Sequence, residues 1–404
     1  MLETLKNKKV AVWGSGIEGK AVLEKLNKTF PNKEIIILSD ENAKLELSKG
    51  LDVVIRSPGV SIYKDEIIEA KKDGVVFITE KTLFYSEIKN SNVVSIGITG
   101  TKGKTTTSIF FTHILQKMGY KTILTGNIGI PTINLIDEAK NADFVITELS
   151  SYQCSDLLEF PKVGILLNLY PEHIDWHKTH ENYYKDKKKL LSGVEIAINE
   201  CSIVYENKFW WYNNKQLWNT KNMKLLGDHN YKNLSFVFTA IDKLGIDLNR
   251  IKQEYLDEFT PIEHRMEIID KDGIKFVNDS IGTTPETALA CFETFREKNI
   301  YSILGGFDRQ QDYSKIARFI QNNNSIKFIT VLGQTASRIK QELKKVNFTN
   351  YKICQSLKEC IDILKEQVKN NSDKNAAIIL SPSAPSYDMY KNFEYRGNEF
   401  KKMI

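Results

Sequence analysis

The residues best suited to chemistry in this 404-residue chain form one short stretch, VVSIGITGTKGKTTTSIF, at positions 93–110. It nearly matches the phosphate-binding pattern G-x-x-x-x-G-K-[ST], but Ile98 stands where the first glycine is expected. The first six residues predict a buried strand, and the residues from Thr105 onward predict a helix. Such a strand, turn and helix N-terminus point backbone N–H groups at one place. We therefore predict an ATP site in which Lys104 reaches the terminal phosphates and the Thr105 hydroxyl binds Mg²⁺.

Two further polar side chains follow buried strands of the same region. Glu148 ends the strand in ADFVITELSSYQ, and His173 follows the strand in VGILLNLYPEHIDWH. A carboxylate and an imidazole at the carboxyl ends of strands beside a phosphate-binding loop are natural ligands for a second metal ion. Zinc is an alternative, because His173, His177 and His180 are spaced i, i+4 and i+7, although no cysteine or H-E-x-x-H frame accompanies them.

The N-terminal stretch predicts a second nucleotide-binding turn. KVAVWGSGIEGKAV contains a G-x-G-x-x-G pattern at Gly14, Gly16 and Gly19, between an expected strand and helix. Asp40 follows the next strand and could bind a ribose hydroxyl, while Ser57-Pro58-Gly59 forms a turn after another strand. NAD is one of several nucleotides that would fit, so a dehydrogenase is an alternative.

Composition limits the remaining possibilities. The chain is 41% hydrophobic and 26% charged, and no apolar run approaches the roughly 18 residues needed to cross a bilayer. The N-terminus enters a strand without a signal-peptide core, so we expect a cytoplasmic protein and no membrane partner. A net charge of +5 spread over a lysine-rich chain is weak evidence for nucleic acid, which we do not expect as a partner. Five scattered cysteines without a C-x-x-C pair indicate reduced thiols.

The elements that must position these residues fall into three α/β blocks, since the chain is too long for one ordinary core. Residues 1–90 predict a Rossmann-like domain, and residues 91–260 predict a P-loop ATPase-like domain with a parallel sheet. Residues 261–404 predict a second Rossmann-like α/β domain, in which each strand ends in small or polar residues where open sheets bind ligands.

The motifs together resemble the Mur ligase family of ATP-dependent amide-bond-forming enzymes. The shifted glycine matches that family's loop, G-T-x-G-K-T, which is spelled here from Gly100 to Thr105. Other matching runs are GNIGIP, ELSSYQ, NLYPEHIDWH, GDHNYKN, EHRME, NDS and LGGFDR. The C-terminal SPSAPSYDMYKNFEYRGNEF resembles the branch that joins glutamate to UDP-N-acetylmuramoyl-L-alanine in peptidoglycan synthesis.

The resemblance implies a ligase that forms an acyl phosphate from ATP and the substrate carboxylate, which the glutamate amine then attacks. It implies two Mg²⁺ sites and a first domain that binds UDP in place of NAD. We expect a monomer. A carbamylated lysine near the second metal is also implied, and Lys187 is the best match, with Lys188 one register away. Without the resemblance, these lysines would be interpreted as a solvated helix face.

The family's site residues transfer to matching positions of this chain. Those implied for catalysis and metal binding are Lys104, Thr105, Glu148, His173 and Lys187. Those for ATP are Gly100, Thr101, Lys102, Gly103, Lys104, Thr105, Thr106, Arg265 and Asp279, with His264 in the same region. Those for the UDP-linked substrate are Gly14, Ser15, Gly16, Asp40, Ser57, Gly59 and Asn127. Those for glutamate are Thr283, Arg309, Ser386 and Phe393, where Arg309 suits a carboxylate and Ser386 is alternatively the N-cap of the next helix.

The sequence departs from the family pattern beside the expected glutamate pocket. In NDSIGTTPE, Ile281 stands where a lysine is usual and Thr284 where an asparagine is usual, and Pro385 stiffens the loop before Ser386. A sister group adds L-glutamate and has a motif nearer to TTPE. We predict D-glutamate as the acceptor and keep L-glutamate, a folylpolyglutamate synthase and a silent nucleotide-sugar sensor as alternatives.

Overall fold

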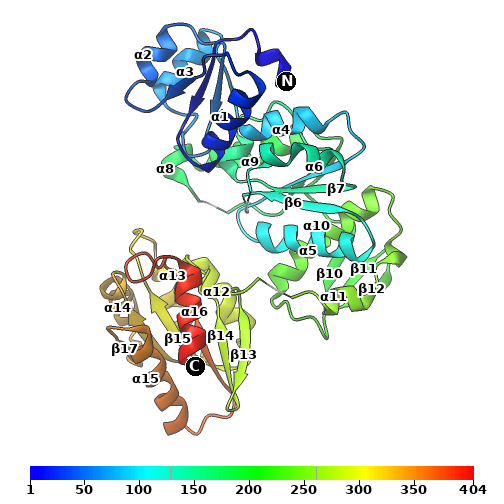
Figure 1. Ribbon diagram of the computed structural model, residues 1–404. Helices are drawn as coiled ribbons and strands as arrows, with labels where there is room; N and C mark the ends of the chain where they lie inside the picture. Colours follow the sequence, from blue (N-terminus) through cyan, green and yellow to red (C-terminus); the bar gives the residue numbers. More distant parts are fainter. Residues whose placement is uncertain (128–129, 171, 261) are drawn as a thin grey trace. The chain divides into compact units, whose positions relative to one another are not determined.

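The computed structural model describes residues 1–127, 130–170, 172–260 and 262–404. Figure 1 shows its helices and strands. The chain forms two compact units, Met1–Met223 with Asn230–Phe259 and Lys224–His229 with Thr260–Ile404. Among the described residues, no helix is both long and apolar enough to cross a bilayer. The first unit contains two separate parallel sheets, and the boundaries at residues 90 and 260 stay predictions.

A parallel four-stranded sheet in the order β2-β1-β3-β4 opens the first unit. Alternate residues of a strand face opposite sides of a sheet. In β1, Val10 and Val12 therefore pack with α1 and α4, whereas Ala11 and Trp13 pack with α2 and α3. The elements are η1 (Glu3–Leu5), β1 (Val10–Trp13), α1 (Ile17–Thr29), β2 (Ile36–Leu38), α2 (Ala43–Ser48), β3 (Val53–Arg56), α3 (Asp65–Lys72), β4 (Val76–Ile78) and α4 (Glu80–Ile88).

A parallel five-stranded sheet in the order β6-β7-β5-β8-β9 follows, with the strand before the phosphate-binding loop at its centre. Helix α5 begins directly after the loop, and Phe110 on it packs edge-on against Phe238 and Phe259. The elements are β5 (Val94–Thr99), α5 (Lys104–Lys117), β6 (Thr122–Gly126), η2 (Thr132–Leu135), α6 (Ile136–Lys140), β7 (Phe144–Glu148), α7 (Ser151–Cys154), β8 (Val163–Leu166), α8 (Ile174–His177), α9 (His180–Lys188), η3 (Lys189–Ser192) and β9 (Ile196–Ile198).

A small antiparallel sheet, β10-β11-β12, completes the first unit together with two helices. Its core is aromatic, because Trp210 and Trp218 both pack against Phe238. The elements are β10 (Val204–Glu206), β11 (Phe209–Tyr212), β12 (Lys215–Asn219), α10 (Asp228–Lys243), η4 (Leu248–Arg250) and α11 (Gln253–Asp257).

The second unit is built on a six-stranded sheet in the order β13-β14-β18-β15-β16-β17, in which only the pairing of β13 with β14 is antiparallel. Helices α12, α13 and α14 cover one face, and α15 and α16 cover the other (Figure 1). The elements are β13 (Glu267–Lys271), β14 (Ile274–Asn278), α12 (Pro285–Thr294), β15 (Asn299–Gly305), α13 (Ser314–Gln321), β16 (Ile326–Leu332), α14 (Ala336–Lys345), β17 (Tyr351–Ile353), α15 (Leu357–Asn370), β18 (Ala376–Leu380) and α16 (Phe393–Met403). The predicted α/β class with parallel sheets is confirmed.

Candidate active site

The phosphate-binding loop has the strand–turn–helix geometry that its sequence predicts. Gly103 is the N-cap of α5 and adopts a left-handed backbone, with φ of 84°. A Cβ atom at this position would lie 2.1 Å from Nδ2 of Asn233, and the left-handed backbone itself favours glycine. The ammonium group of Lys104 folds back over the turn and donates to the carbonyls of Gly100 at 3.0 Å and Thr101 at 3.2 Å. The lysine is thus held at the mouth of an anion-binding turn.

Asn168, which follows β8, binds the backbone of the phosphate-binding loop at Lys102. Its Oδ1 accepts from the backbone N–H of Lys102 at 2.9 Å, and its Nδ2 donates to the carbonyl of Lys102 at 2.9 Å. The Lys102 ammonium is paired with Glu172 at 2.6 Å. Asn168 is not among the predicted site residues, although a polar residue at the carboxyl end of a neighbouring strand was the available signal.

Glu148, at the end of β7, offers an oxygen that the described protein groups leave unused. The residue is 2% exposed, and its Oε1 accepts from Nδ2 of Asn127 at 3.1 Å. Its Oε2 is buried and has no hydrogen-bond partner among the described residues, and the same holds for Oγ1 of Thr106. Buried polar atoms normally have partners. A carboxylate and hydroxyls, including that of Thr105 at the start of α5, form a donor set suited to Mg²⁺.

The structure separates the two candidate lysines of α9. Lys187 is 2% exposed, and its ammonium group donates to the carbonyl of Gly100 at 2.8 Å. Burial, reinforced by the nearby cation of Lys104, lowers the pKa of Lys187 to about 7. Lys188 is exposed to solvent. Of the two, Lys187 is therefore the lysine at the phosphate-binding loop.

The three histidines do not converge on one point. His173 is exposed and has a left-handed backbone, with φ of 57°, and His180 is exposed as well. His177 is buried between Asp186, 2.7 Å from its Nδ1, and Ser151, 2.9 Å from its Nε2. The described residues contain no group of three or more His, Cys, Asp or Glu side chains that could hold a metal ion, so the zinc alternative loses its support.

The buried Ser151–His177–Asp186 line has the hydrogen-bond order of a hydrolase triad, but Ser151 is only 2% exposed. A nucleophile needs access to substrate, so we assign this line a structural role. Sequence reasoning missed it, because a bond between residues 151 and 177 leaves no local pattern.

The predicted UDP-binding turns of the first sheet lie side by side. Oγ of Ser57 donates to the carbonyl of Gly14 at 3.2 Å, and a Cβ atom at Gly19 would lie 2.1 Å from the same carbonyl oxygen. Asp40 is exposed and paired with Lys64 at 3.0 Å. The other predicted residues of these turns are exposed: Ser15, Gly16 and Gly59.

In the second unit, Asp279 follows β14 and is 3% exposed. Its Oδ2 accepts from Oγ of Ser381 at 2.6 Å, and its Oδ1 accepts from the backbone N–H of Met266 at 3.3 Å. Burial raises the pKa of Asp279 to about 7, although Ser381 and the charge of half-buried Arg265 oppose the shift. His264 is buried, and its Nδ1 lies 2.9 Å from Nδ2 of Asn278.

Three of the residues predicted for glutamate, Thr283, Arg309 and Ser386, lie on loops at the carboxyl edge of the same sheet. Arg309 is exposed and lies 5.8 Å from the ring centroid of Tyr387. Oγ of Ser386 is buried and has no hydrogen-bond partner among the described residues. The carbonyl of Thr283 accepts from Gln311 at 3.0 Å. An exposed guanidinium and a buried hydroxyl without a partner are consistent with a site for a carboxylate ligand.

The N-cap alternative for Ser386 is wrong. Helix α16 begins at Phe393, which is half-buried, and its N-cap is Asn392, whose side chain accepts from the backbone N–H of Tyr395 at 2.8 Å. Ser386 instead begins a turn, since its carbonyl accepts from Tyr390 at 2.8 Å. The chain between residues 386 and 392 makes a turn that the sequence did not reveal.

The departures in NDSIGTTPE have different structural settings. Thr284 is the N-cap of α12 and forms a capping box with Thr287, with Pro285 in the first turn. Asparagine and threonine both cap helices, so this change preserves the helix start. Ile281 is half-buried, and its backbone N–H donates to the carbonyl of His264 at 3.1 Å. Nothing in the structure shows which group replaces the lysine usual at Ile281.

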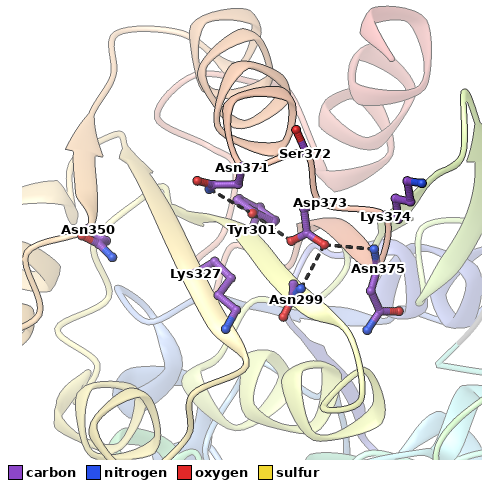
Figure 2. A pocket seen from close by; sticks show the side chains of 9 residues that line it. All are labelled: Asn299, Tyr301, Lys327, Asn350, Asn371, Ser372, Asp373, Lys374 and Asn375. Atoms are coloured by element: carbon purple, nitrogen blue, oxygen red, sulfur yellow. Dashed lines mark hydrogen bonds between the residues drawn. The ribbon is translucent and has the colours of Figure 1, made fainter.

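A hollow of about 650 Å³ lies at the opposite, amino edge of the C-terminal sheet. Figure 2 shows its polar lining, in which the Asp373 carboxylate accepts from Nδ2 of Asn299 at 2.9 Å and from the hydroxyl of Tyr301 at 3.0 Å. None of the predicted site residues lines this hollow. In this unit, the loop residues predicted for glutamate, Thr283, Arg309 and Ser386, lie instead at the carboxyl edge of the sheet.

A glycine-lysine-threonine turn between a central parallel strand and a helix defines the P-loop class of nucleotide-binding proteins. Comparison with family models narrows this class. The Mur ligase middle domain matches residues 98–218, and the Mur ligase, glutamate ligase domain matches residues 264–384. The chain belongs to the Mur ligase family.

Full-length relatives support this membership. The chain is 32% identical to the UDP-N-acetylmuramoylalanine–D-glutamate ligase of Clostridium botulinum (strain Hall), over 99% of this chain and 97% of the relative. It is 28% identical to the UDP-N-acetylmuramoyl-L-alanine–L-glutamate ligase of Xanthomonas axonopodis pv. citri, over 100% of this chain and 96% of the relative. The fold is similar to that of the MurF ligase from Thermotoga maritima solved with ADP, with a TM-score of 0.61 and 13% identity, over 100% of this chain and 95% of that one.

Proposed function

We propose that this protein joins D-glutamate to UDP-N-acetylmuramoyl-L-alanine and converts ATP to ADP and phosphate, in peptidoglycan precursor synthesis. The main support is the edge of the central sheet, where Lys104 and Lys187 both bind the carbonyl of Gly100. The substrates come from the names of relatives that align over nearly the whole chain. We place the reaction in the cytoplasm, where ATP and nucleotide sugars are available, and expect a monomer.

The reaction has two steps. A carboxylate oxygen of the substrate's alanine attacks the γ-phosphorus of ATP, the bond to ADP breaks, and an acyl phosphate forms. The glutamate amine then attacks the acyl carbon, phosphate leaves, and the nitrogen loses a proton as the amide forms. Lys104 and the backbone N–H groups of the loop hold the transferring phosphoryl group, so catalysis rests on position and charge neutralisation.

Magnesium, when bound, would neutralise charge on the phosphoryl oxygens. The free oxygen of Glu148 and the hydroxyl of Thr105 suit one ion, because Mg²⁺ prefers oxygen ligands. We assign His173 and Lys187 to a second ion. An ammonium group cannot bind a cation, so the role of Lys187 requires a chemical change.

Carbamylation would supply that change. Because the pKa of Lys187 is about 7, a large fraction of this amine is neutral at neutral pH, whereas an ordinary lysine is almost fully charged. The neutral nitrogen adds to the carbon of CO₂, and loss of a proton leaves a carbamate with two oxygen ligands. Exposed Lys188 lacks this environment.

The remaining substrate contacts are also proposals. For ATP we assign the loop from Gly100 to Thr106 together with Arg265 and Asp279. For the UDP-linked substrate we assign Gly14, Ser15, Gly16, Asp40, Ser57, Gly59 and Asn127. For glutamate we assign Thr283, Arg309, Ser386 and Phe393. The G-x-G-x-x-G turn thus serves a UDP-linked substrate, and the dehydrogenase alternative is unnecessary.

L-glutamate is the second candidate acceptor. The run NDSIGTTPE departs from the usual D-glutamate pattern at Ile281 and Thr284, and two full-length relatives are named L-glutamate ligases. A folylpolyglutamate synthase is less well supported, because the glutamate ligase relatives align with the first 90 residues as well.

The test is a phosphate-release assay with ATP, Mg²⁺ and UDP-N-acetylmuramoyl-L-alanine, to which D-glutamate and L-glutamate are added separately. Release with the D isomer supports the proposal. Release with the L isomer alone would transfer it to the second candidate and make NDSIGTTPE a specificity determinant. Release with neither isomer would contradict ligation and favour the nucleotide-sugar sensor.

A further inference from the structure

Residues 56–63, the last residue of β3 and the loop that follows it, have contacts that the proposed reaction does not explain. We call this segment the substrate loop, because it contains the turn Ser57-Pro58-Gly59 assigned to the UDP-linked substrate. It contacts three segments, at or near helices α7, α8 and α9, that come 96 to 123 residues later in the chain. Each of these segments follows or contains one proposed metal ligand.

The first contact is to the segment after Glu148. Arg56 is 1% exposed, and its guanidinium donates to both oxygens of Asp156, at 3.0 and 2.6 Å, and to the carbonyl of Tyr152 at 2.8 Å. The same group donates to the carbonyl of Val60 at 2.6 Å, inside the substrate loop. A fully hydrogen-bonded buried arginine is a rigid connection.

The second contact is to the segment after His173. The indole Nε1 of Trp176 on α8 donates to the carbonyl of Pro58 at 3.1 Å. The hydroxyl of Ser61 donates to the carbonyl of Trp176 at 2.6 Å. The short helix that follows His173 is therefore bound to the substrate loop at both its side chain and its backbone.

The third contact is to the segment that contains Lys187. The hydroxyl of Tyr63 lies 3.1 and 3.2 Å from the two carboxylate oxygens of Asp186, the residue before Lys187. Burial and this carboxylate raise the pKa of Tyr63, so its hydroxyl stays protonated and donates. Asp186 also bonds His177, which in turn bonds Ser151 on α7. This line connects the ends of α7, α8 and α9.

We infer that the substrate loop is a positioning element of the metal site. It holds in place the segments that carry or follow the three proposed ligands outside the phosphate-binding loop, Glu148, His173 and Lys187. The inference rests on the proposed function for the identity of those ligands. Metal affinity depends on how outer hydrogen bonds orient the ligands, so loosening one contact weakens binding without removing a ligand. By thermodynamic linkage, occupation of the substrate loop and metal binding then affect each other reciprocally.

The test measures Mn²⁺ binding to the full-length protein in the presence of ADP, by electron paramagnetic resonance of free Mn²⁺. Tyr63→Phe removes only the hydroxyl and should weaken Mn²⁺ binding about tenfold, the lower end of the cost of losing an outer partner. Trp176→Phe removes the bond to Pro58 and should weaken it by a smaller factor. Tyr301→Phe is the matched control, because it also removes a hydroxyl bound to a carboxylate, that of Asp373, in the second unit.

Thermal unfolding of the same variants separates positioning from general stability. A positioning role predicts that Tyr63→Phe and Tyr301→Phe lower the melting temperature similarly, while only Tyr63→Phe changes Mn²⁺ affinity. If the wild type binds Mn²⁺ but Tyr63→Phe and Trp176→Phe match it within about twofold, the inference is overturned and the proposed function stands. If the wild type with ADP binds no Mn²⁺, the metal assignment fails and the inference fails with it.

Discussion

The carboxyl edges of the central sheet and of the C-terminal sheet differ in how their charged groups are held. At the central sheet, Lys187 and Glu148 are each 2% exposed and are bound by neighbouring protein groups. At the C-terminal sheet, Arg309 is exposed on a loop. Burial lowers the pKa of Lys187 to about 7. Groups that must have a defined charge and geometry before the substrate arrives are buried in a rigid frame. A group that recognises a charged substrate can remain in water until that substrate binds.

The strongest test of this comparison is Lys187→Ala. Removing this buried cation or its carbamate should lower kcat by about 10²–10³-fold, the cost of losing one preorganised electrostatic group. Lys188→Ala is the control, because its side chain is exposed on the same helix, and it should leave kcat nearly unchanged. Steady-state phosphate release measures both. Equal losses would contradict the distinction made between these lysines.

At the carboxyl edge of the C-terminal sheet, Arg309→Met should weaken the binding of glutamate. Loss of a charge-assisted pair with the substrate carboxylate should raise the KM for glutamate about 10- to 100-fold, with a smaller change in the KM for ATP. Arg318→Met is a suitable comparison, because Arg318 is exposed on α13 and its guanidinium donates to the hydroxyl of Ser314 at 3.1 Å. A rise in both KM values would show that Arg309 is not specific to glutamate.

Asp279 differs from Arg309 in being buried at the carboxyl edge of the C-terminal sheet. Its ionised carboxylate should lower the free energy of unfolding, and replacing it should restore that stability. The pKa of Asp279 is about 7 in the folded chain and 3.8 when the side chain is in water, as in the unfolded chain. The carboxyl therefore ionises at a lower pH in the unfolded chain than in the folded chain. This group therefore lowers stability progressively as pH rises from about 4 to 7, and the cost persists above pH 7. Asp279→Asn should gain about 1–3 kcal/mol over the wild type at pH 8 and little at pH 4.

Urea unfolding at the two pH values measures the gain for Asp279→Asn. The same variant should bind ATP more weakly, if the carboxylate contacts the ribose. A stability difference that does not change with pH would mean that Asp279 titrates normally in the folded protein.

The smallest expected effect is that of Ser386→Ala. The hydroxyl of Ser386 is buried without a partner among the described residues, so its removal should stabilise the free protein by up to about 1 kcal/mol. The KM for glutamate should rise a few-fold, because the ligand then loses a hydrogen bond. Thermal unfolding with and without glutamate measures both changes. A destabilised variant would show that the hydroxyl is satisfied in the free protein.

Local patterns predicted the parts of the site that are themselves local. The run from Val94 to Lys117 forms its strand, turn and helix from consecutive residues, so composition and spacing sufficed to place Lys104. The same logic failed at Ser386, which looked like a helix cap. Several side chains near it can cap a helix, and the turn after Ser386 delays the helix start to Phe393.

The sequence by itself determined the α/β class, the phosphate-binding loop and the family, because strand periodicity and contiguous motifs depend on near neighbours in the chain. Only the tertiary structure decided that Lys187 is buried while Lys188 is exposed, because adjacent helical residues point in different directions and packing selects the buried one. It alone joined Arg56 to Asp156 and Tyr63 to Asp186. Such pairs lie 100 or more residues apart and meet only when the first two sheets pack together.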